Sequence, residues 1–188
     1  MTRATARVVP RPSPSLSALD LRMMAHEELL ELYHRLEPPI FEEMHGEYAA
    51  TMLDQGSRMA NLRSRFKVHF QGLWLCKAFE PTGPNEGHGY NNFRRPEGVF
   101  RASRMRTRLG PSKLAGDTKD AFHLEYADFN DFRSGGLAGA HQHTMFDEVR
   151  KVGPGLYLGI GRRGHTKKSR AQLHPFILEG PVAPFVRD

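Results

Sequence analysis

The sequence predicts a mainly β (α+β) fold, in which N-terminal helices cap an antiparallel β-barrel. Two observations carry this prediction. From residue 66 onward, apolar and polar residues alternate in six short runs separated by segments rich in glycine and proline, which is the pattern of antiparallel strands with one buried face. Residues 17–56 instead space their apolar side chains as helices do. If the sheet closes on itself, its inward side chains line a pocket.

Residues 17–56 are predicted to form two helices that cap one end of the barrel. Ser17 followed by Asp20 is a capping-box pattern at the start of the first helix. Consecutive prolines at positions 38 and 39 end this helix. In the second helix, which we expect to run from there to residue 56, apolar side chains recur at every fourth position, namely Met44, Tyr48 and Met52.

Six strands are predicted after residue 65. They cover residues 66–79, 99–109, 121–129, 144–152, 156–161 and 175–178. We expect the first and longest of them to bend at Gly72, because an internal glycine weakens a strand. The connecting loops are rich in Gly, Pro, Asn and Ser, and they cover residues 81–89, 110–117 and 134–139.

Length and composition indicate one domain. The chain has 188 residues, enough for one hydrophobic core and short for two. We assign residues 17–188 to this domain, with a helical cap at 17–56 and the barrel at 66–180. The single cysteine, Cys76, excludes an intramolecular disulfide and a multi-cysteine zinc site. The apolar runs are too short to span a bilayer, and we expect a cytoplasmic protein.

Residues 1–16 are predicted to be a disordered, basic tail. The first nineteen residues carry three arginines and no acid, a composition that organelle import signals share. Prolines at positions 10, 12 and 14 disfavour the amphipathic helix that such signals form. Organelle import is therefore kept as an alternative to the cytoplasmic location.

The formal net charge of +6 is concentrated in patches. Residues 94–108 hold six arginines and one glutamate, and residues 162–170 hold five cations. Arginines 104, 106 and 108 share one face of their strand, and Met105, Thr107 and Leu109 share the other. Because Met105, Thr107 and Leu109 are better core residues, we expect the three arginines to lie outside the barrel. Such patches keep a nucleic-acid-binding module open as an alternative. Few aromatic side chains stand near them for base stacking, so nucleic acid is not the partner that we expect.

The pattern His141-Gln-His143 is the strongest metal-like element, since alternate residues of a strand point the same way and can chelate one ion. With Gly135, Glu148 and Gly155 at the observed spacings, this segment resembles the first motif of the cupin family. That resemblance implies, as an alternative, a cupin-like barrel and a metal-dependent enzyme. Its one divalent transition metal would be bound by His141, His143 and Glu148. The second cupin motif is not found downstream.

A second resemblance covers more of the chain. Gly72-Leu-Trp74-Leu-Cys76, an Arg-Met-Arg strand, Asp147-x-Val149-Arg150-x-Val152 and a closing Pro-Phe-Ile-Leu segment follow one another in order. This series is similar to a small family of unknown function that is named for its Gly-x-Trp-x-Gly signature, over about residues 66–180. The resemblance implies a compact, lipocalin-like antiparallel barrel and no particular mechanism. Cys76 replaces the second signature glycine.

Strand periodicity selects the side chains that we expect inside the barrel. Glu148 and Arg150 share one face of their strand, and a buried pair of this kind is costly unless each charge is compensated. We predict Glu148 as the acid/base and Arg150 as an electrophilic clamp, with Tyr126 and Tyr157 as hydrogen-bond donors. A purely structural Glu–Arg pair that closes one end of the barrel is the alternative.

Two histidines are predicted at the mouth of the barrel, where His141 and His143 could form the proton-transfer pair instead, since imidazole titrates near neutrality. The residues that we expect to contact a ligand combine aromatic, aliphatic and acidic side chains. They are Trp74, Phe122, Leu124, Phe146 and Asp128.

The functional hypothesis is a β-barrel that encloses a small, largely apolar organic molecule. It would catalyse acid/base chemistry of the isomerase, cyclase or lyase type without a cofactor. The alternatives are a non-catalytic carrier of a small hydrophobic ligand, the metal-dependent enzyme and the nucleic-acid-binding module. We expect no membrane partner, and a homodimer is left open.

Overall fold

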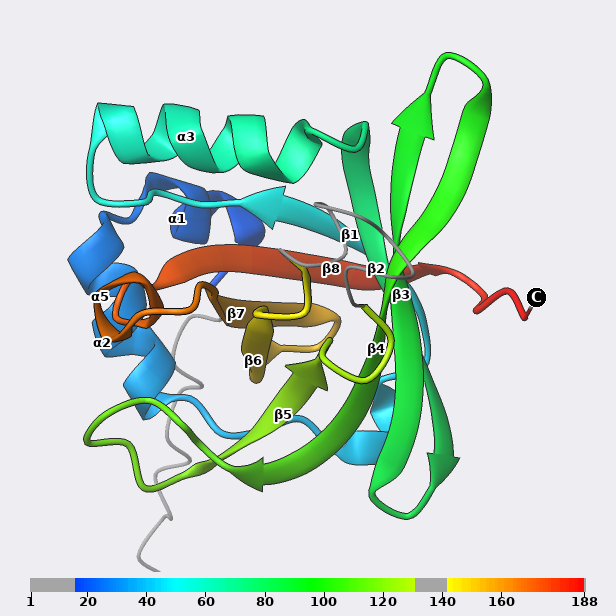
Figure 1. Ribbon diagram of the computed structural model, residues 1–188. Helices are drawn as coiled ribbons and strands as arrows, with labels where there is room; N and C mark the ends of the chain where they lie inside the picture. Colours follow the sequence, from blue (N-terminus) through cyan, green and yellow to red (C-terminus); the bar gives the residue numbers. More distant parts are fainter. Residues whose placement is uncertain (1–15, 131–141, 188) are drawn as a thin grey trace, which may run out of the picture.

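The computed structural model describes residues 16–130 and 142–187, which form a closed, eight-stranded antiparallel barrel (Figure 1). Each strand pairs with its neighbours in sequence, and the first pairs with the last. The strands are β1 Gly46–Met52, β2 Leu73–Gly83, β3 Glu86–Arg95, β4 Gly98–Pro111, β5 Asp120–Glu125, β6 Phe146–Gly153, β7 Leu156–Arg162 and β8 His174–Ala183. The predicted antiparallel barrel is confirmed. Its up-and-down strand order is lipocalin-like, and the cupin-like alternative, a double-sheet arrangement, is wrong.

Two short helices cover the outer face of the barrel. They are α1 Ala18–Met23 and α2 His26–Arg35, and their leucines pack on outward side chains of β7 and β8. The capping box predicted at Ser17 is present, because Ser17 and Asp20 exchange hydrogen bonds between side chain and backbone. No helix in the described part of the chain is long and apolar enough to cross a bilayer.

The second predicted helix, at residues 39–56, is wrong. The chain there forms a short 3-10 helix, η1 Phe41–Glu43, and then strand β1. Strand β1 hydrogen-bonds to β2 on one side and to β8 on the other, so it closes the barrel. The tertiary pairing outweighs the local helical spacing of the apolar residues.

The segment predicted as the first strand, residues 66–79, begins as a helix and continues as a strand. Helix α3 Arg58–His69 extends into it, and strand β2 begins at Leu73. The break lies at the predicted bend, Gly72, whose φ of +140° favours glycine. Strand β3 was not predicted because its sequence is rich in Gly and Asn, and its first part falls in the segment expected to be a loop.

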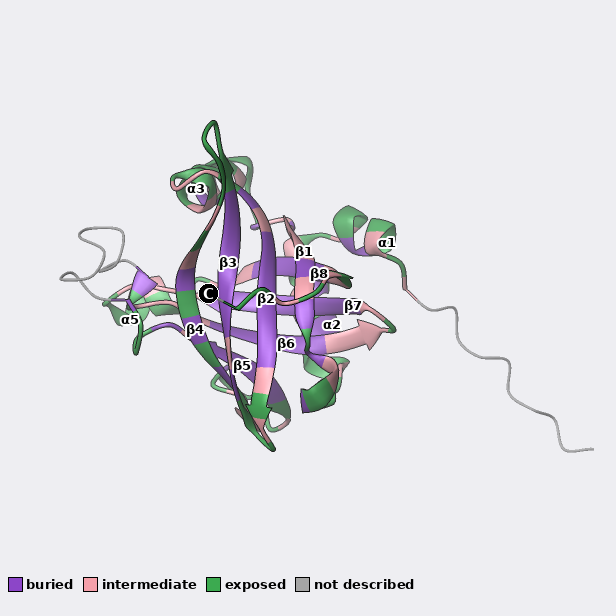
Figure 2. Cartoon of the chain, turned by 90° about the vertical axis from the view of Figure 1, so that its right-hand side faces the viewer, coloured by how far each residue is buried: buried purple, intermediate pink, exposed green. Residues whose placement is uncertain are grey.

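A cluster dominated by aromatic side chains fills the barrel. All eight strands contribute to it, and Figure 2 shows the buried strands surrounded by exposed loops and helices. The packing leaves little room beside Phe176, since a Cβ added to Gly159 would lie 2.2 Å from its ring. Only glycine at position 159 therefore admits this ring. The main inward side chains are Tyr48, Trp74, Phe79, Phe93, Met105, Phe122, Leu124, Val149, Tyr157, Phe176 and Leu178.

The predicted inward position of Glu148 and Arg150 is wrong. On β6 the inward residues are Asp147 and Val149, while Glu148 and Arg150 lie on the outer face and are nevertheless fully buried. The cover is α2 together with the segment that joins β4 to β5. This second layer buries the outer face of the strands beneath it. The side chains on the outer face of such a strand can therefore be more apolar than those on its inner face. Alternation identified the two faces but not which one points inward.

Each of these two buried charges has its own outer-layer partners. Arg150 donates from both terminal nitrogens to Asp117, at 2.8 Å each, and also to the carbonyl of Tyr33. Glu148 accepts from the hydroxyl of Ser112 and from the backbone N–H of the next residue. The two side chains thus anchor loops and α2 to the outside of the barrel.

We expect Asp117→Asn to lower the free energy of unfolding by about 3 kcal/mol, because it leaves the buried Arg150 guanidinium without its carboxylate. The matched control is Asp128→Asn, which removes an exposed carboxylate 3.0 Å from Arg106 and should cost less than about 1 kcal/mol. Urea unfolding measures both values. Equal losses in the two variants would contradict the importance of the outer-layer pair.

Candidate functional site

A cavity of about 90 Å³ lies in the mouth of the barrel, under α3. The mouth is the end at which β1, β3 and β7 finish and β2, β6 and β8 begin. Helix α3 covers it because the chain that joins β1 to β2 passes over this end (Figure 1). The wall is largely apolar and is formed by Met52, Val68, Trp74, Phe93, Met145 and Phe176.

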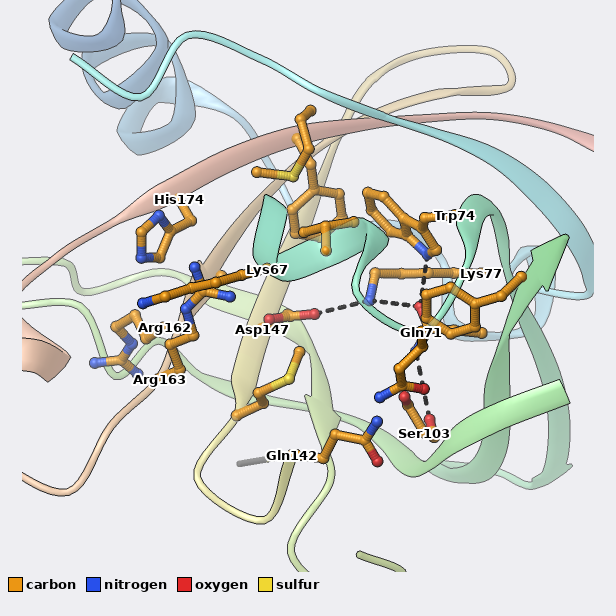
Figure 3. Close-up of a pocket in the computed structure, with 17 residues that line it drawn as sticks. Lys67, Gln71, Trp74, Lys77, Ser103, Gln142, Asp147, Arg162, Arg163 and His174 are labelled. Atoms are coloured by element: carbon orange, nitrogen blue, oxygen red, sulfur yellow. Dashed lines mark hydrogen bonds and ion pairs between the residues drawn. The ribbon is translucent and has the colours of Figure 1, made fainter. Parts of the chain in front are cut away.

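Two buried opposite charges, Lys77 and Asp147, form the polar floor of the cavity (Figure 3). The Lys77 ammonium lies 2.9 Å from Asp147 Oδ2, and it also donates to Tyr126 and to Asn91 Oδ1. The Tyr126 hydroxyl donates to the same Asp147 oxygen at 2.8 Å, and Trp74 Nε1 donates to Asn91. The network therefore compensates both charges with directed hydrogen bonds.

Aromatic rings provide further stabilisation for the buried ammonium. Lys77 Nζ lies 5.2–5.3 Å from the ring centroids of Trp74, Tyr126 and Phe176. A cation within about 6 Å of a ring face is attracted by the ring quadrupole. Burial and the Asp147 carboxylate raise the pKa of Tyr126 well above 10, so this phenol stays protonated and remains a donor.

Two backbone features shape the floor. A bulge in β4 places Ser103 at a φ of +52°, and the Ser103 carbonyl accepts from Asn91. A left-handed conformation in a non-glycine residue is costly and is concentrated at functional sites. At Gly161 an added Cβ would lie 2.9 Å from Asp147 Oδ1, so the glycine leaves room for the carboxylate.

The rim of the cavity is positively charged. Lys67 on α3 and Arg163 after β7 both line it (Figure 3), and neither forms an ion pair with any residue in 16–130 or 142–187. Burial and the nearby charges of Arg163 and Arg63 lower the pKa of Lys67, and burial lowers the pKa of Arg163. Burial, Arg163 and Lys67 lower the pKa of His174 to about 4. This rim favours a negative charge.

Several predicted site residues do lie inside the barrel. Trp74 lines the cavity, and Tyr126 lies behind its floor. Phe122 and Leu124 belong to the inner cluster but pack below the cavity. Tyr157 is also inward, at the opposite end, where its hydroxyl donates to Glu43.

Other predicted residues lie elsewhere. Asp128 is exposed and pairs with Arg106, and Phe146 packs on the outer face against His123. The predicted ligand contacts at these two positions are therefore wrong for this cavity. The ring Nδ1–H of His143 donates to the backbone carbonyls of Ala127 and Asn130, at 3.0 Å each.

His141 lies outside the described residues. Among those described, no three His, Cys, Asp or Glu side chains are grouped as metal ligands, and the metal-site alternative stays a prediction. The basic tail at residues 1–16 likewise falls almost wholly outside the described chain.

The residues that sequence reasoning missed are Lys67, Lys77, Asp147 and Arg163. Lys77 interrupts the otherwise apolar run from Trp74 to Phe79, and a lone cation inside a strand core is a signal for a buried partner. Asp147 alternates with Glu148, so the prediction that Glu148 points inward leaves Asp147 on the outer face. Arg163 lies after a strand, in a segment whose position follows only from the closed fold.

Comparisons with known proteins support the fold alone. No protein-family model matches the sequence, and no curated protein matches it. A crystal structure of a protein from Thermomonospora curvata is similar, with 19% sequence identity and a TM-score of 0.52. The similarity covers 83% of this chain and 87% of that one.

We expect the NMR titration of His174 to have its midpoint near pH 4. Because the folded pKa lies below the ordinary 6.5, the unfolded chain binds the proton more readily. The contribution of His174 to stability is therefore complete above pH 6.5, and about 2 kcal/mol is lost as the pH falls from 6.5 to 4. The double variant Lys67→Gln/Arg163→Gln should raise the midpoint, whereas Arg106→Gln should leave it unchanged. A midpoint near 6.5 in the unmodified protein would refute the charged rim.

Proposed function

We propose that this protein binds a small organic anion with an apolar body in the mouth of the barrel. The observation that carries the proposal is the juxtaposition of Lys67 and Arg163 with an apolar, aromatic wall. Neither cation forms a close ion pair with a described residue, although Asp147 acts on Arg163 from a greater distance, and both are partly desolvated. A carboxylate, sulfonate or phosphate group at the rim would supply the missing charge.

The charge balance of the cavity supports an anion. Four cations line it against the single carboxylate of Asp147. Lys77 is paired with that carboxylate, and Arg162 lies 3.7 Å from Glu148. Among the described residues, Lys67 and Arg163 therefore leave the cavity with a net positive charge that an anionic ligand would compensate.

The wall supports a ligand whose remaining part is apolar. Trp74 and Phe176 contact one another edge to face, with ring centroids 6.1 Å apart, and they offer surfaces on which a ring or a short chain can pack. A concave, mostly apolar site with a few convergent polar groups is typical of small-molecule binding.

The acid/base chemistry predicted from the sequence is proposed as a second function of the same cavity. The candidate residues change, because Glu148 and Arg150 lie on the outer face. Asp147 lines the cavity and would act as the base, while Lys77 would stabilise negative charge that develops on the substrate. Tyr126 would position Asp147 through its hydrogen bond.

We expect the aromatic sulfonate 1-anilinonaphthalene-8-sulfonate to quench the fluorescence of Trp74. Trp74 is the single tryptophan of the chain and lies in the cavity wall, so its quenching reports occupancy of this site. The neutral analogue N-phenyl-1-naphthylamine should bind at least tenfold more weakly, because it cannot compensate the rim cations. Arg163→Gln should weaken binding of the sulfonate about tenfold and leave that of the neutral analogue unchanged.

Arg106→Gln, on the outside of the barrel, is the matched control and should alter neither affinity. Equal affinities for the charged and the neutral probe would contradict the anion proposal. So would an undiminished affinity of the Arg163→Gln variant for the sulfonate.

Proton transfer is tested with small 2-oxo acids that have aromatic or aliphatic bodies, incubated with the protein in D₂O. We expect the protein to accelerate deuterium incorporation next to the carbonyl by about 100-fold or more. Asp147→Asn should abolish the acceleration while Trp74 fluorescence still reports binding. Binding without any acceleration would contradict the catalytic proposal and support a carrier.

A further inference from the structure

Helix α3 presents an apolar face to solvent. Its inner side carries the buried Ser64 and the cavity-lining Val68. At 3.6 residues per turn, the opposite side carries four large apolar residues, and Leu73 continues this surface after the helix. These five side chains are 51–72% exposed, and they are Met59, Leu62, Phe66, Phe70 and Leu73.

Cations flank this apolar face on both sides, and no acid occurs between residues 58 and 73. Arg58 and Arg65 lie along one flank of the helix, and Arg63 and Lys67 along the other. A contiguous apolar patch of this kind is uncommon on a soluble protein without a partner.

The turn between β3 and β4 extends the same surface. It rises on the α3 side of the molecule in both views (Figures 1 and 2), and Arg95 Nε donates to the carbonyl of Gln71 at the end of the helix. This turn adds Arg94, Arg95 and the exposed Val99, with Glu97 as its single acid. The whole surface, which we call the α3 face, thus carries six cations against one acid.

We propose that the α3 face docks on an anionic lipid surface. Helices that lie in a membrane interface combine an apolar face with basic flanks, so that the apolar side chains enter the acyl boundary while the cations contact the headgroups. A second copy of the chain fits less well, because two α3 faces would bring like charges together. The proposal departs from the sequence expectation of no membrane partner and does not depend on the proposed function.

Docking in this way would place the cavity mouth at the lipid surface, because the inner side of the same helix lines the cavity. Lys67 belongs to two sites, because it lies at the edge of the α3 face and also at the rim of the cavity. The test therefore leaves Lys67 unchanged.

Vesicle flotation with the full chain tests the proposal. We expect binding to phosphatidylcholine vesicles that contain phosphatidylserine, little binding to phosphatidylcholine alone, and release at about 1 M salt, where the Debye length is about 3 Å. Arg63→Gln/Arg65→Gln should lower the partition coefficient about 30-fold. Phe66→Ser/Phe70→Ser should lower it at least tenfold. Both variants keep the arginines of residues 1–15, so a loss is assigned to the α3 face.

The matched control is Ile40→Ser/Val182→Ser, which removes two exposed apolar side chains distant from the α3 face and should bind as the unmodified protein does. Circular dichroism and the melting temperature confirm that every variant is folded. Failure of the unmodified protein to bind phosphatidylserine vesicles at low salt would overturn the proposal. So would a dimer in sedimentation equilibrium that Phe66→Ser/Phe70→Ser dissociates, because the second copy would then be the occupant.

Discussion

An ion pair inside the barrel, between Lys77 and Asp147, is the interaction on which the mouth of this protein depends. An uncompensated charge in an apolar interior costs several kcal/mol. Here hydrogen bonds from Tyr126 and to Asn91, together with three surrounding aromatic rings, compensate the charges. These groups come from β2, β3, β6, β8 and the residue after β5, so the pair links strands around the barrel and forms a polar floor beneath an apolar wall.

Burial on both faces of the sheet explains how the fold positions this site. The inner aromatic cluster occupies the closed end and the centre, while α1, α2 and the β4–β5 segment bury the outer face of β6, β7 and β8. Charged residues are buried in both layers, with Arg150 paired outside and Lys77 paired inside. The outer pair anchors α2 and the β4–β5 segment to the barrel, whereas the inner pair borders the cavity in the barrel mouth.

The periodicity of the sequence was sufficient to predict a barrel fold. It was insufficient to predict which residues line the cavity. Alternation predicted β4 to β8, since these strands carry an apolar side chain at every second position. Strand β1 was missed because Met44, Tyr48 and Met52 recur at every fourth position, which is the spacing of a helix. On β6, alternation separated Asp147 from Glu148 correctly, but a second buried layer made the outer face look like a core. Tyr126 was found because it alternates with the inward residues Phe122 and Leu124, and Trp74 because a large aromatic side chain is usually buried.

The proposed role of the barrel mouth is to hold an organic anion between its cationic rim and its aromatic wall. A crystal structure of the complex with 1-anilinonaphthalene-8-sulfonate is the decisive experiment. We expect the sulfonate about 3 Å from Arg163 or Lys67, with the rings packed against Trp74. A ligand found only on the outside of the barrel, with the mouth unchanged, would show that the mouth does not bind the anion.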